Sequence, residues 1–380
     1  PEIVEEYMGK VNAKLGTNYQ LFNYYGAPDA ERVIVAMGSI CDVAEEVIDY
    51  LMAKGEKVGL VKVRLYRPFR ADKLLEAIPE TCKKIAVLDR TKEPGAQGEP
   101  LYLDVVTAVA NAGKNIKVCG GRYGLGSKDT PPASVFAVYT ELEKEEPKRQ
   151  FTIGIVDDVT ELSLPEVDAP STAAEGTVEC KFWGLGGDGT VGANKNSLKI
   201  IGGKTDMYTQ AYFAYDAKKS GGVTQSHLRF GKDPIHATYL VSSADFVAVH
   251  NQVYLEKFDT TADLKQNGKF LLNCNRSGAE LEAWLPASVK KTLALKKARL
   301  FVIDATSIAQ RLGLGSHTNT VLQAAFFKLA RVMMLGKAIK REFRHLLHPR
   351  TVGVIKFEGK TVDDKTVNSV TVYLALCFFL

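Results

Sequence analysis

The stretch Arg32–Leu65, RVIVAMGSICDVAEEVIDYLMAKGEKVGLVKVRL, places an amphipathic segment between two apolar runs rich in β-branched residues. Short continuous apolar runs are typical of strands that helices cover on both faces, and the periodic segment between them is typical of a helix. The stretch therefore predicts a strand–helix–strand unit with strands at Val33–Met37 and Val58–Leu65 and a helix at Asp42–Lys54.

The same alternation continues along the chain to about residue 119. Further helices are predicted at Ala71–Ile78 and Pro100–Ala112, and further strands at Ile85–Asp89 and Ile116–Cys119. This order predicts an α/β fold with a doubly wound parallel sheet, whose ligand-facing loops follow the carboxyl ends of the strands. Those loops are Gly38-Ser39, Arg67-Pro68-Phe69, Arg90–Gly98 and Gly120–Lys128.

A second α/β pattern follows residue 178. Its predicted strands are Val178–Trp183, Tyr208–Ala214, Val223–Arg229, Phe246–His250, Phe270–Asn273 and Leu300–Ile303, and its predicted helices are Leu281–Lys296 and Thr320–Met334. A chain of 380 residues is longer than one core usually grows, so two domains are expected. We predict a first domain at 1–145, a linker at 146–177 rich in Pro, Ser, Ala and acidic residues, a mixed α/β domain at 178–335, and a divergent tail at 336–380.

Composition favours an ordinary globular protein that binds neither nucleic acid nor membrane. Charged residues make up 24% of the chain, and the net charge of +5 is spread along it rather than gathered in a basic stripe. The apolar run Val370–Leu380 is too short to span a bilayer, and it predicts a strand or a truncated end. The first residues lack the pattern of a signal peptide, so we expect the chain to begin inside a longer polypeptide.

The six cysteines are far apart, and no pair has the C-x-x-C spacing that gathers thiolates around a metal. The sequence therefore predicts no iron–sulfur or zinc site in this chain. Isolated cysteines in apolar surroundings are typical of reduced, buried thiols, which favours a cytoplasmic location.

The strongest local signal is Phe182–Lys195, FWGLGGDGTVGANK, in which a predicted strand runs into glycines and then into a helix. Glycines let backbone N–H groups approach an anion, and a helix N-terminus attracts negative charge. Phosphate, pyrophosphate or the phosphates of coenzyme A are the natural ligands, with Lys195 as a supporting cation. A tight turn that needs glycines for packing alone is the alternative.

Two sharper alternatives depend on spacing. The glycines of Gly184–Gly189 match the dinucleotide fingerprint, whose acid would be Asp206, although a turn is expected there. Gly187–Gly189 also resembles the start of a thiamine-diphosphate magnesium motif, which needs asparagines downstream, and 213–220 contains none.

A second group of polar residues is Lys218, Lys219, Ser220, His227 and Arg229. If 223–231 is a strand, His227 and Arg229 lie on the same face, and the group could surround an anion. A solvated hairpin edge is the alternative. The remaining histidines lack metal-binding spacing, so His236, His250, His317, His345 and His348 are expected to be hydrogen-bonded structural residues.

Several of these segments resemble the pyruvate:ferredoxin (flavodoxin) oxidoreductases over at least residues 1–335. Arg67–Arg70, Val87–Ala96, Gly120–Lys128 and Phe151–Thr160 resemble the transketolase-C-terminal-like domain of that family, called domain II, and the linker after it. Phe182–Lys195, Ala214–Gly231 and Asn319–Phe327 resemble its gamma-type domain. From about Gly336 onward the sequence departs from the family's pattern.

The resemblance implies part of an enzyme that cleaves pyruvate on thiamine diphosphate with Mg²⁺, passes electrons through 4Fe-4S clusters to ferredoxin or flavodoxin, and transfers the acetyl group to coenzyme A. It implies that this chain is scaffold, inactive alone and without catalytic residues, and that the remaining domains of a homodimeric enzyme hold the thiamine and iron–sulfur groups. The positions expected to contact coenzyme A or neighbouring domains are Gly186, Gly187, Asp188, Gly189, Thr190, Asn194, Lys195, Lys218, Lys219, His227 and Arg229. A standalone module that binds coenzyme A or phosphate, and a nicotinamide-dependent dehydrogenase, remain alternative predictions.

Overall fold

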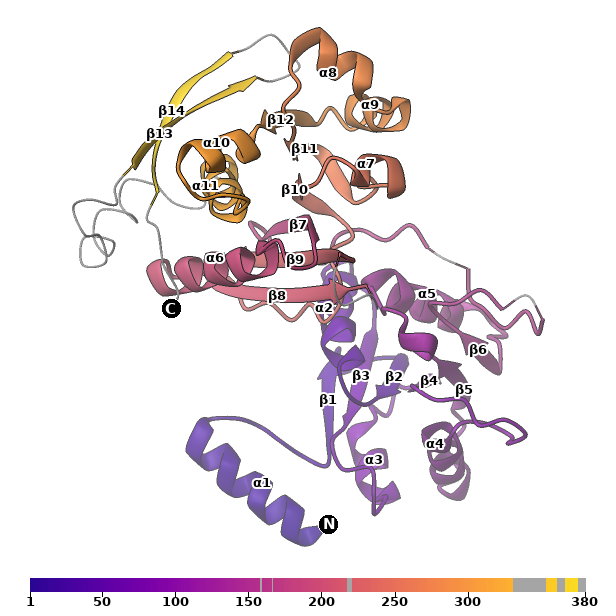
Figure 1. Ribbon diagram of the computed structural model, residues 1–380. Helices are drawn as coiled ribbons and strands as arrows, with labels where there is room; N and C mark the ends of the chain where they lie inside the picture. Colours follow the sequence, from indigo (N-terminus) through magenta and orange to yellow (C-terminus); the bar gives the residue numbers. More distant parts are fainter. Residues whose placement is uncertain (158, 166, 217–220, 331–352, 361–365, 375–380) are drawn as a thin grey trace. The chain divides into compact units, whose positions relative to one another are not determined.

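Figure 1 shows a computed structural model of the chain, in which residues 1–157, 159–165, 167–216, 221–330, 353–360 and 366–374 are described. The chain folds as two compact units. The first comprises Pro1–Ala173 together with His236–Leu240, and the second comprises Ala174–Ile235 and Val241–Leu380.

The first unit contains a six-stranded sheet with the order β1-β3-β2-β4-β5-β6. Its strands are β1 (Phe22–Gly26), β2 (Arg32–Ala36), β3 (Val58–Val63), β4 (Lys84–Asp89), β5 (Lys117–Arg122) and β6 (Gln150–Thr152). Neighbouring strands from β3 through to β6 pair in parallel, and β1 adds an antiparallel edge beside β3. The predicted doubly wound sheet is confirmed, with an antiparallel edge strand that the sequence pattern did not indicate.

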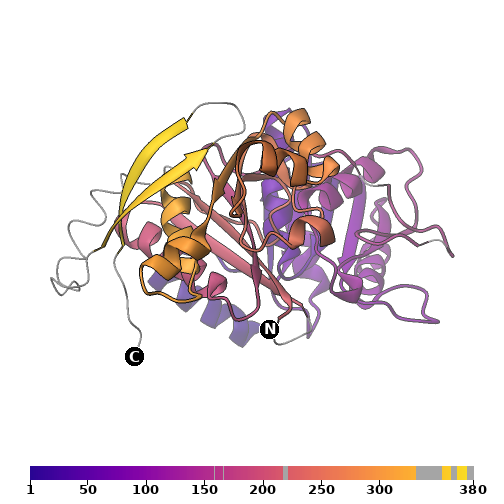
Figure 2. The ribbon, with the colours of Figure 1, turned by 45° about the horizontal axis from the view of Figure 1, so that its top comes forward.

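Helices cover both faces of this sheet (Figures 1 and 2). The helices α2 (Ile40–Ala53) and α5 (Pro132–Glu143) contact each other on one face, and α3 (Ala71–Ala77) and α4 (Pro100–Asn111) contact each other on the other. Alternate residues of a strand point to opposite faces, so Val33 and Val35 of β2 pack in the core that Leu74 of α3 and Leu101 of α4 complete. The remaining long helix, α1 (Glu2–Leu15), has no fully buried residue.

The predicted linker at 146–177 needs a correction at its start. Gln150–Thr152 forms β6, which pairs with β5 and so belongs to the first sheet. A strand of three residues is too short to show a recognisable apolar period in the sequence, so only its pairing with the neighbouring strand identifies it.

The second unit contains a mixed six-stranded sheet with the order β12-β11-β10-β7-β9-β8. Its strands are β7 (Val178–Leu185), β8 (Tyr208–Tyr215), β9 (Val223–Gly231), β10 (Ala244–Val249), β11 (Leu264–Asn273) and β12 (Arg299–Ile303). β7, β10, β11 and β12 run parallel, whereas β9 is antiparallel to both of its neighbours, β7 and β8. All six predicted strands are present, which confirms a mixed α/β fold.

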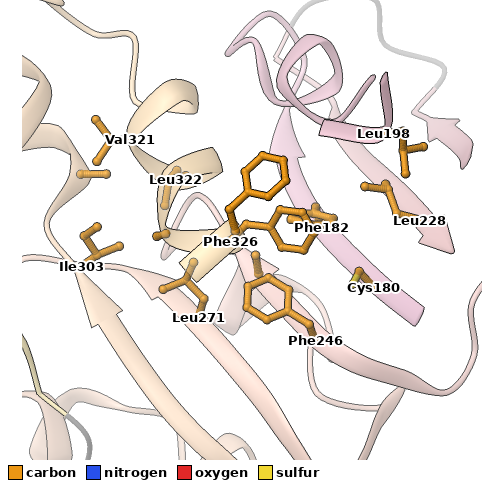
Figure 3. Close-up of a cluster of buried hydrophobic side chains, with 14 of the residues drawn as sticks. Cys180, Phe182, Leu198, Leu228, Phe246, Leu271, Ile303, Val321, Leu322 and Phe326 are labelled. Atoms are coloured by element: carbon orange, nitrogen blue, oxygen red, sulfur yellow. The ribbon is translucent and has the colours of Figure 1, made fainter. Parts of the chain in front are cut away.

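Two groups of helices pack against this sheet (Figure 1). The first group is α6 (Thr190–Lys204), α10 (Ala305–Arg311) and α11 (Asn319–Ala330); the second is α7 (Tyr254–Lys257), α8 (Gly278–Trp284) and α9 (Ala287–Leu295). Figure 3 shows the core under the first group, where the rings of Phe182 and Phe246 lie 5.1 and 5.4 Å from that of Phe326. This aromatic cluster joins α11 to the middle of the sheet.

The single helix predicted at Leu281–Lys296 is in fact two helices. α8 ends at Trp284, and α9 begins at Ala287 directly after Pro286. Proline lacks the backbone N–H that a continuous helix needs at this point, and its ring disfavours a helical residue before it. The break therefore follows from Leu285-Pro286 itself.

The described part of the C-terminal region is an antiparallel pair, β13 (Gly353–Lys360) and β14 (Thr366–Leu374). β14 includes the first part of the apolar run predicted at Val370–Leu380. The rest of that run, and residues 336–352 of the predicted divergent tail, lie outside the described residues. Among the helices that the structure describes, none combines the length and apolar character that crossing a bilayer requires.

Candidate functional site

The candidate site lies at one edge of the second sheet, where the carboxyl ends of four parallel strands meet. β7 leads into the glycine turn Gly186–Gly189, and β10 leads into His250. β11 ends at Asn273, and β12 leads into Asp304 at the start of α10. In open α/β sheets this edge is where ligands bind, because helix N-termini and loops gather there.

The glycine turn needs glycine at specific positions. Gly187 and Gly189 adopt left-handed φ angles of 95° and 82°, which side chains rarely tolerate. A Cβ atom added to Gly184 would lie 2.7 Å from the Cβ of Thr190, so the strand and the first helical turn of α6 pack without space for a side chain. The turn is thereby folded tightly against the N-terminus of α6.

Asp188 closes the turn with its own carboxylate. One oxygen accepts a hydrogen bond from the backbone N–H of Leu185 at 2.8 Å, and the other accepts from that of Thr190, also at 2.8 Å. The negative charge lies at the N-terminus of a 15-residue helix, where the helix dipole stabilises it. Asp188 therefore satisfies part of the anion-binding capacity that the sequence predicted for this loop.

Thr190 connects the turn to a buried histidine. Its Oγ1 lies 2.7 Å from Nδ1 of His250, and the amide of Asn273 donates to the backbone oxygen of His250 at 3.0 Å. Burial lowers the pKa of His250 to about 4, and the nearby Asp188 acts weakly in the opposite direction. His250 is therefore neutral near pH 7, and it is hydrogen-bonded within the fold as predicted.

Four backbone N–H groups, two in the glycine turn and two in the first turn of α6, are open to a ligand among the described residues. Among the described residues, the amides of Gly187, Gly189, Val191 and Gly192 donate to no hydrogen-bond acceptor. Gly192 is exposed, and nothing lies within 4 Å of the position that its Cβ would take. The turn can therefore donate several hydrogen bonds to an anion approaching from the solvent side.

The two polar residues of α6 that we predicted to lie at the site are placed differently from each other. Asn194 is 4% exposed, and its Nδ2 has no hydrogen-bond partner among the described residues. Lys195 is exposed, and its ammonium lies 5.2 Å from the ring centroid of Phe213 on β8. Lys195 is thus on the helix that carries the turn, with its charge over a neighbouring strand.

The structure does not bring Arg229 to the glycine turn. Its guanidinium Nε donates to Oε1 of Glu179 at 2.8 Å, and both side chains are almost fully buried. In the β7–β9 ladder Arg229 pairs with Glu179. Glu179 lies six residues before Leu185, so about 20 Å of strand separates it from the residue that precedes the glycine turn. Arg229 forms a buried ion pair at the opposite end of β7, so the grouping we predicted around an anion is wrong for this residue.

His227 is also buried, and it pairs with Lys181 in the same ladder. Its Nδ1 accepts the backbone N–H of Val241 at 3.1 Å, and burial lowers its pKa to about 3 with help from Lys181 and Arg229. The alternative prediction, a solvated hairpin edge, is wrong because β9 has a strand on each side. Lys218, Lys219 and Ser220 lie outside the described residues.

The position of Asp206 does not suit a dinucleotide site. It is exposed and precedes β8, whereas the ribose-binding acid of the dinucleotide fingerprint follows the carboxyl end of a strand. The glycines of the turn match that fingerprint without its acid.

Together these features define a protein of two α/β units, the second of which presents a glycine turn at the carboxyl edge of its parallel strands. Residues 179–356 match the family "Pyruvate ferredoxin/flavodoxin oxidoreductase", and residues 30–135 match "Pyruvate:ferredoxin oxidoreductase core domain II". The chain belongs to the pyruvate:ferredoxin/flavodoxin oxidoreductase family.

Relatives from distant organisms match almost the whole chain. It is 56% identical over 340 residues to the pyruvate:ferredoxin oxidoreductase of Moorella thermoacetica, covering 90% of this chain and 29% of that protein. It is 50% identical over 368 residues to the pyruvate-flavodoxin oxidoreductase of Enterobacter agglomerans, covering 96% and 31%. The mitochondrial pyruvate dehydrogenase [NADP(+)] of Euglena gracilis is 47% identical over 351 residues, covering 91% and 19%. The chain thus spans less than a third of the length of these relatives.

Sequence reasoning did not place His250 and Asn273 together at this edge. Their contact exists because β10 and β11 are adjacent in the sheet, and no spacing in the sequence encodes that adjacency. The role of Asp188 had a visible signal, since an aspartate just before a helix is a common partner of its first free N–H groups.

Proposed function

We propose that this chain is part of a pyruvate:ferredoxin (flavodoxin) oxidoreductase, located in the cytoplasm. The complete enzyme would convert pyruvate and coenzyme A to acetyl-CoA and CO₂ while ferredoxin or flavodoxin accepts the two electrons. The identity of 47–56% over about nine-tenths of the chain supports this proposal. The chain would supply two α/β domains of a homodimer, and the remaining domains would bind the thiamine diphosphate, Mg²⁺ and 4Fe-4S clusters.

Among the residues that the structure describes, the cysteines do not fit an iron–sulfur cluster. Its five described cysteines are all buried and free, and burial raises the pKa of Cys41 and Cys82 to about 12 and that of Cys119 to about 11. Cluster ligands are thiolates gathered at one place. Within the described residues, no three His, Cys, Asp or Glu side chains are grouped as metal ligands.

The choice of electron acceptor is proposed to depend on parts of the enzyme outside this segment. The names of the three relatives contain ferredoxin, flavodoxin and NADP(+), yet each matches this segment at 47% identity or more. A segment that selected the acceptor would be expected to diverge with it.

For coenzyme A, we propose that the glycine turn contacts one of the anionic groups. The open amides of Gly187, Gly189, Val191 and Gly192 would donate to phosphate oxygens, while Asp188 and the buried Thr190 hold the turn in shape. Asn194 is buried in the same helix. Lys195 adds a positive charge on the same helix. His227 and Arg229 are not part of this proposal, because they are buried away from the turn.

The test changes charge at the turn while keeping size constant. In the complete enzyme, Gly192→Asp would place a carboxylate in the first turn of α6, where it favours the helix but repels a phosphate. Gly192→Asn is the matched control with nearly the same shape and no charge. We expect the KM for coenzyme A to rise about fivefold or more in the Asp variant relative to the Asn variant, with the KM for pyruvate unchanged.

Two outcomes separate the parts of the proposal. Equal coenzyme A requirements in the two variants would remove the turn from coenzyme A binding and leave the family function intact. A complete enzyme that reduces no ferredoxin or flavodoxin with pyruvate and coenzyme A would remove the function itself. The isolated chain is expected to show no pyruvate oxidation.

A further inference from the structure

The first sheet has a switch point between β2 and β4. From β2 the chain passes through α2 to β3 on one side, and from β3 it passes through α3 to β4 on the other side of β2. Because the two crossovers diverge, the loops after β2 and β4 leave a crevice between them. Doubly wound sheets bind ligands in such crevices.

A small cavity lies at this position, and all of its lining residues belong to the first unit. Ser39 follows β2, Arg90 follows β4, and Tyr123 follows β5, so the lining comes from the carboxyl ends of three neighbouring strands. Ile40 and Val43 of α2 supply its apolar part, and both are buried.

Two cations line this cavity. Arg90 and Lys128 are exposed, and neither forms an ion pair with any acidic side chain in the described part of the chain. The Arg90 side chain lies against Gly124, where an added Cβ would meet its Nε at 2.8 Å. Gly124 thus leaves room for the arginine beside the loop that carries Lys128.

Hydroxyl groups and one carboxylate complete the lining. Tyr123 is buried, and its hydroxyl donates to the backbone oxygen of Met37 at 3.2 Å. Thr130 also lines the cavity, and its hydroxyl forms no hydrogen bond among the described residues. One oxygen of Asp129 accepts the backbone N–H of Leu240 at 2.9 Å, which leaves its other oxygen for a donor on a ligand.

The segment His236–Leu240 fixes one side of the cavity. Thr238 lines it and donates from Oγ1 to the backbone oxygen of Ser39 at 2.7 Å. Tyr239 donates to Oε2 of Glu46 on α2 at 2.8 Å. These bonds, together with the one to Asp129, tie the segment to both sides of the crevice, so the lining is held in place rather than formed by free surface loops.

We propose that this cavity is a binding site for a small phosphomonoester, with the phosphate between Arg90 and Lys128 and a ligand hydroxyl donating to Asp129. The two cations match the charge of a phosphate, and the carboxylate selects a ligand that also carries a donor. The site is separate from the glycine turn, and it does not depend on the proposed reaction of the complete enzyme.

The purified chain can be titrated with inorganic phosphate and with glycerol 3-phosphate, followed by ³¹P NMR. We expect saturable binding with a Kd in the millimolar range, tighter for glycerol 3-phosphate. Arg90→Ala and Lys128→Ala should each weaken binding about fivefold or more, whereas Lys92→Ala, an exposed lysine of the same loop that does not line the cavity, should leave it unchanged.

Asp129→Asn gives an independent test, because the amide keeps an acceptor for Leu240 while removing the negative charge. It should tighten inorganic phosphate severalfold and reduce the advantage of glycerol 3-phosphate. Absence of saturable binding would overturn the proposal, as would equal weakening by Lys92→Ala and Arg90→Ala in variants whose circular dichroism shows a folded chain. Equal affinity for the two ligands would overturn the assignment of Asp129.

Discussion

Two groups of basic side chains, one from each unit, lie in opposite surroundings. In the first unit Arg90 and Lys128 lie exposed in loops at the carboxyl edge of the sheet, and neither forms an ion pair among the described residues. In the second sheet Arg229 and His227 lie inside the sheet, in the antiparallel strand β9, and are buried. A charge at an open edge is available to a ligand at little cost to folding, whereas a charge inside a sheet must be paired to be tolerated.

The Glu179–Arg229 pair shows how the second sheet tolerates its charges. Arg229 lies between β7 and β8 in the sheet, where it meets Glu179 on one side and Gln210 on the other. Lys265 of β11 adds a second cation 3.3 Å from the carboxylate of Glu179. The same residue type thus has a structural role in one unit and a proposed binding role in the other.

The largest effect should come from breaking the buried pair. Arg229→Met leaves Glu179, which is 3% exposed, without its main partner, and should lower the free energy of unfolding of the second unit by about 3–5 kcal/mol. Urea unfolding followed by tryptophan fluorescence measures this unit alone, because both tryptophans of the chain, Trp183 and Trp284, belong to it. The double variant Arg229→Met/Glu179→Met should recover most of the loss. A change below about 1 kcal/mol in the single variant would contradict the pairing.

The next effect depends on pH. The folded-state pKa values of His250 and His227, about 4 and about 3, lie below the ordinary value of 6.5. Both histidines therefore bind a proton more weakly in the folded state than in the unfolded state. Their stabilising contribution is complete above pH 6.5 and is lost as the pH falls below it. Between pH 7.5 and pH 5, each histidine should lower the free energy of unfolding by about 2 kcal/mol.

Urea midpoints at pH 7.5 and pH 5 test this expectation. His250→Asn and His227→Gln should each reduce the pH dependence of the second unit, and His236→Gln, an exposed histidine of the first unit, should not. A pH dependence that neither buried substitution changes would assign it to other groups.

Smaller changes in stability are expected from two alanine substitutions near the glycine turn, one that affects packing and one that affects helix propensity. Gly184→Ala would place a methyl group 2.7 Å from Thr190 and should cost about 1–3 kcal/mol. Gly192→Ala adds a methyl group to open space in a helix and should stabilise by about 0.5–1 kcal/mol. Thermal unfolding followed by tryptophan fluorescence compares the two variants. Equal effects would mean that the turn does not pack as described.

The smallest effect is expected at the open edge of the first sheet. Arg90→Ala and Lys128→Ala remove exposed cations that form no ion pair in the described structure, so each should change stability by less than about 0.5 kcal/mol. Thermal unfolding followed by circular dichroism measures the change. A loss comparable to that of Arg229→Met would show that these cations are structural, as Arg229 is.

Helices and strands whose apolar residues recur at a clear period could be predicted from the sequence, and those without such a period could not. The strands of the parallel sheets and the helices between them follow from apolar runs and amphipathic segments, as Val33–Met37 and Asp42–Lys54 illustrate. β6 was placed in a linker because three residues carry no period. β1 escaped prediction because its pairing with β3 runs antiparallel at the edge, outside the βαβ pattern.

The candidate site also has a part that the sequence predicts and a part that it does not. The glycine turn and its helix were predictable, because left-handed glycines and a following helix leave a local trace in the sequence. The grouping of Arg229 with that turn was not, because the alternation of side chains along β9 says which residues share a face but not what lies beside them. Pairing with Glu179 depends on the register of β9 against β7, which is set by contacts distant in sequence.

The amino-acid sequence by itself determined the family, the two α/β units and the glycine turn, since these depend on local patterns and on the similarity of long segments to relatives. Only the tertiary structure decided which charges are buried and which remain free. That outcome depends on strand order and register, which bring Glu179 to Arg229 and leave Arg90 at an open edge, and both are properties of contacts between segments rather than of any one segment.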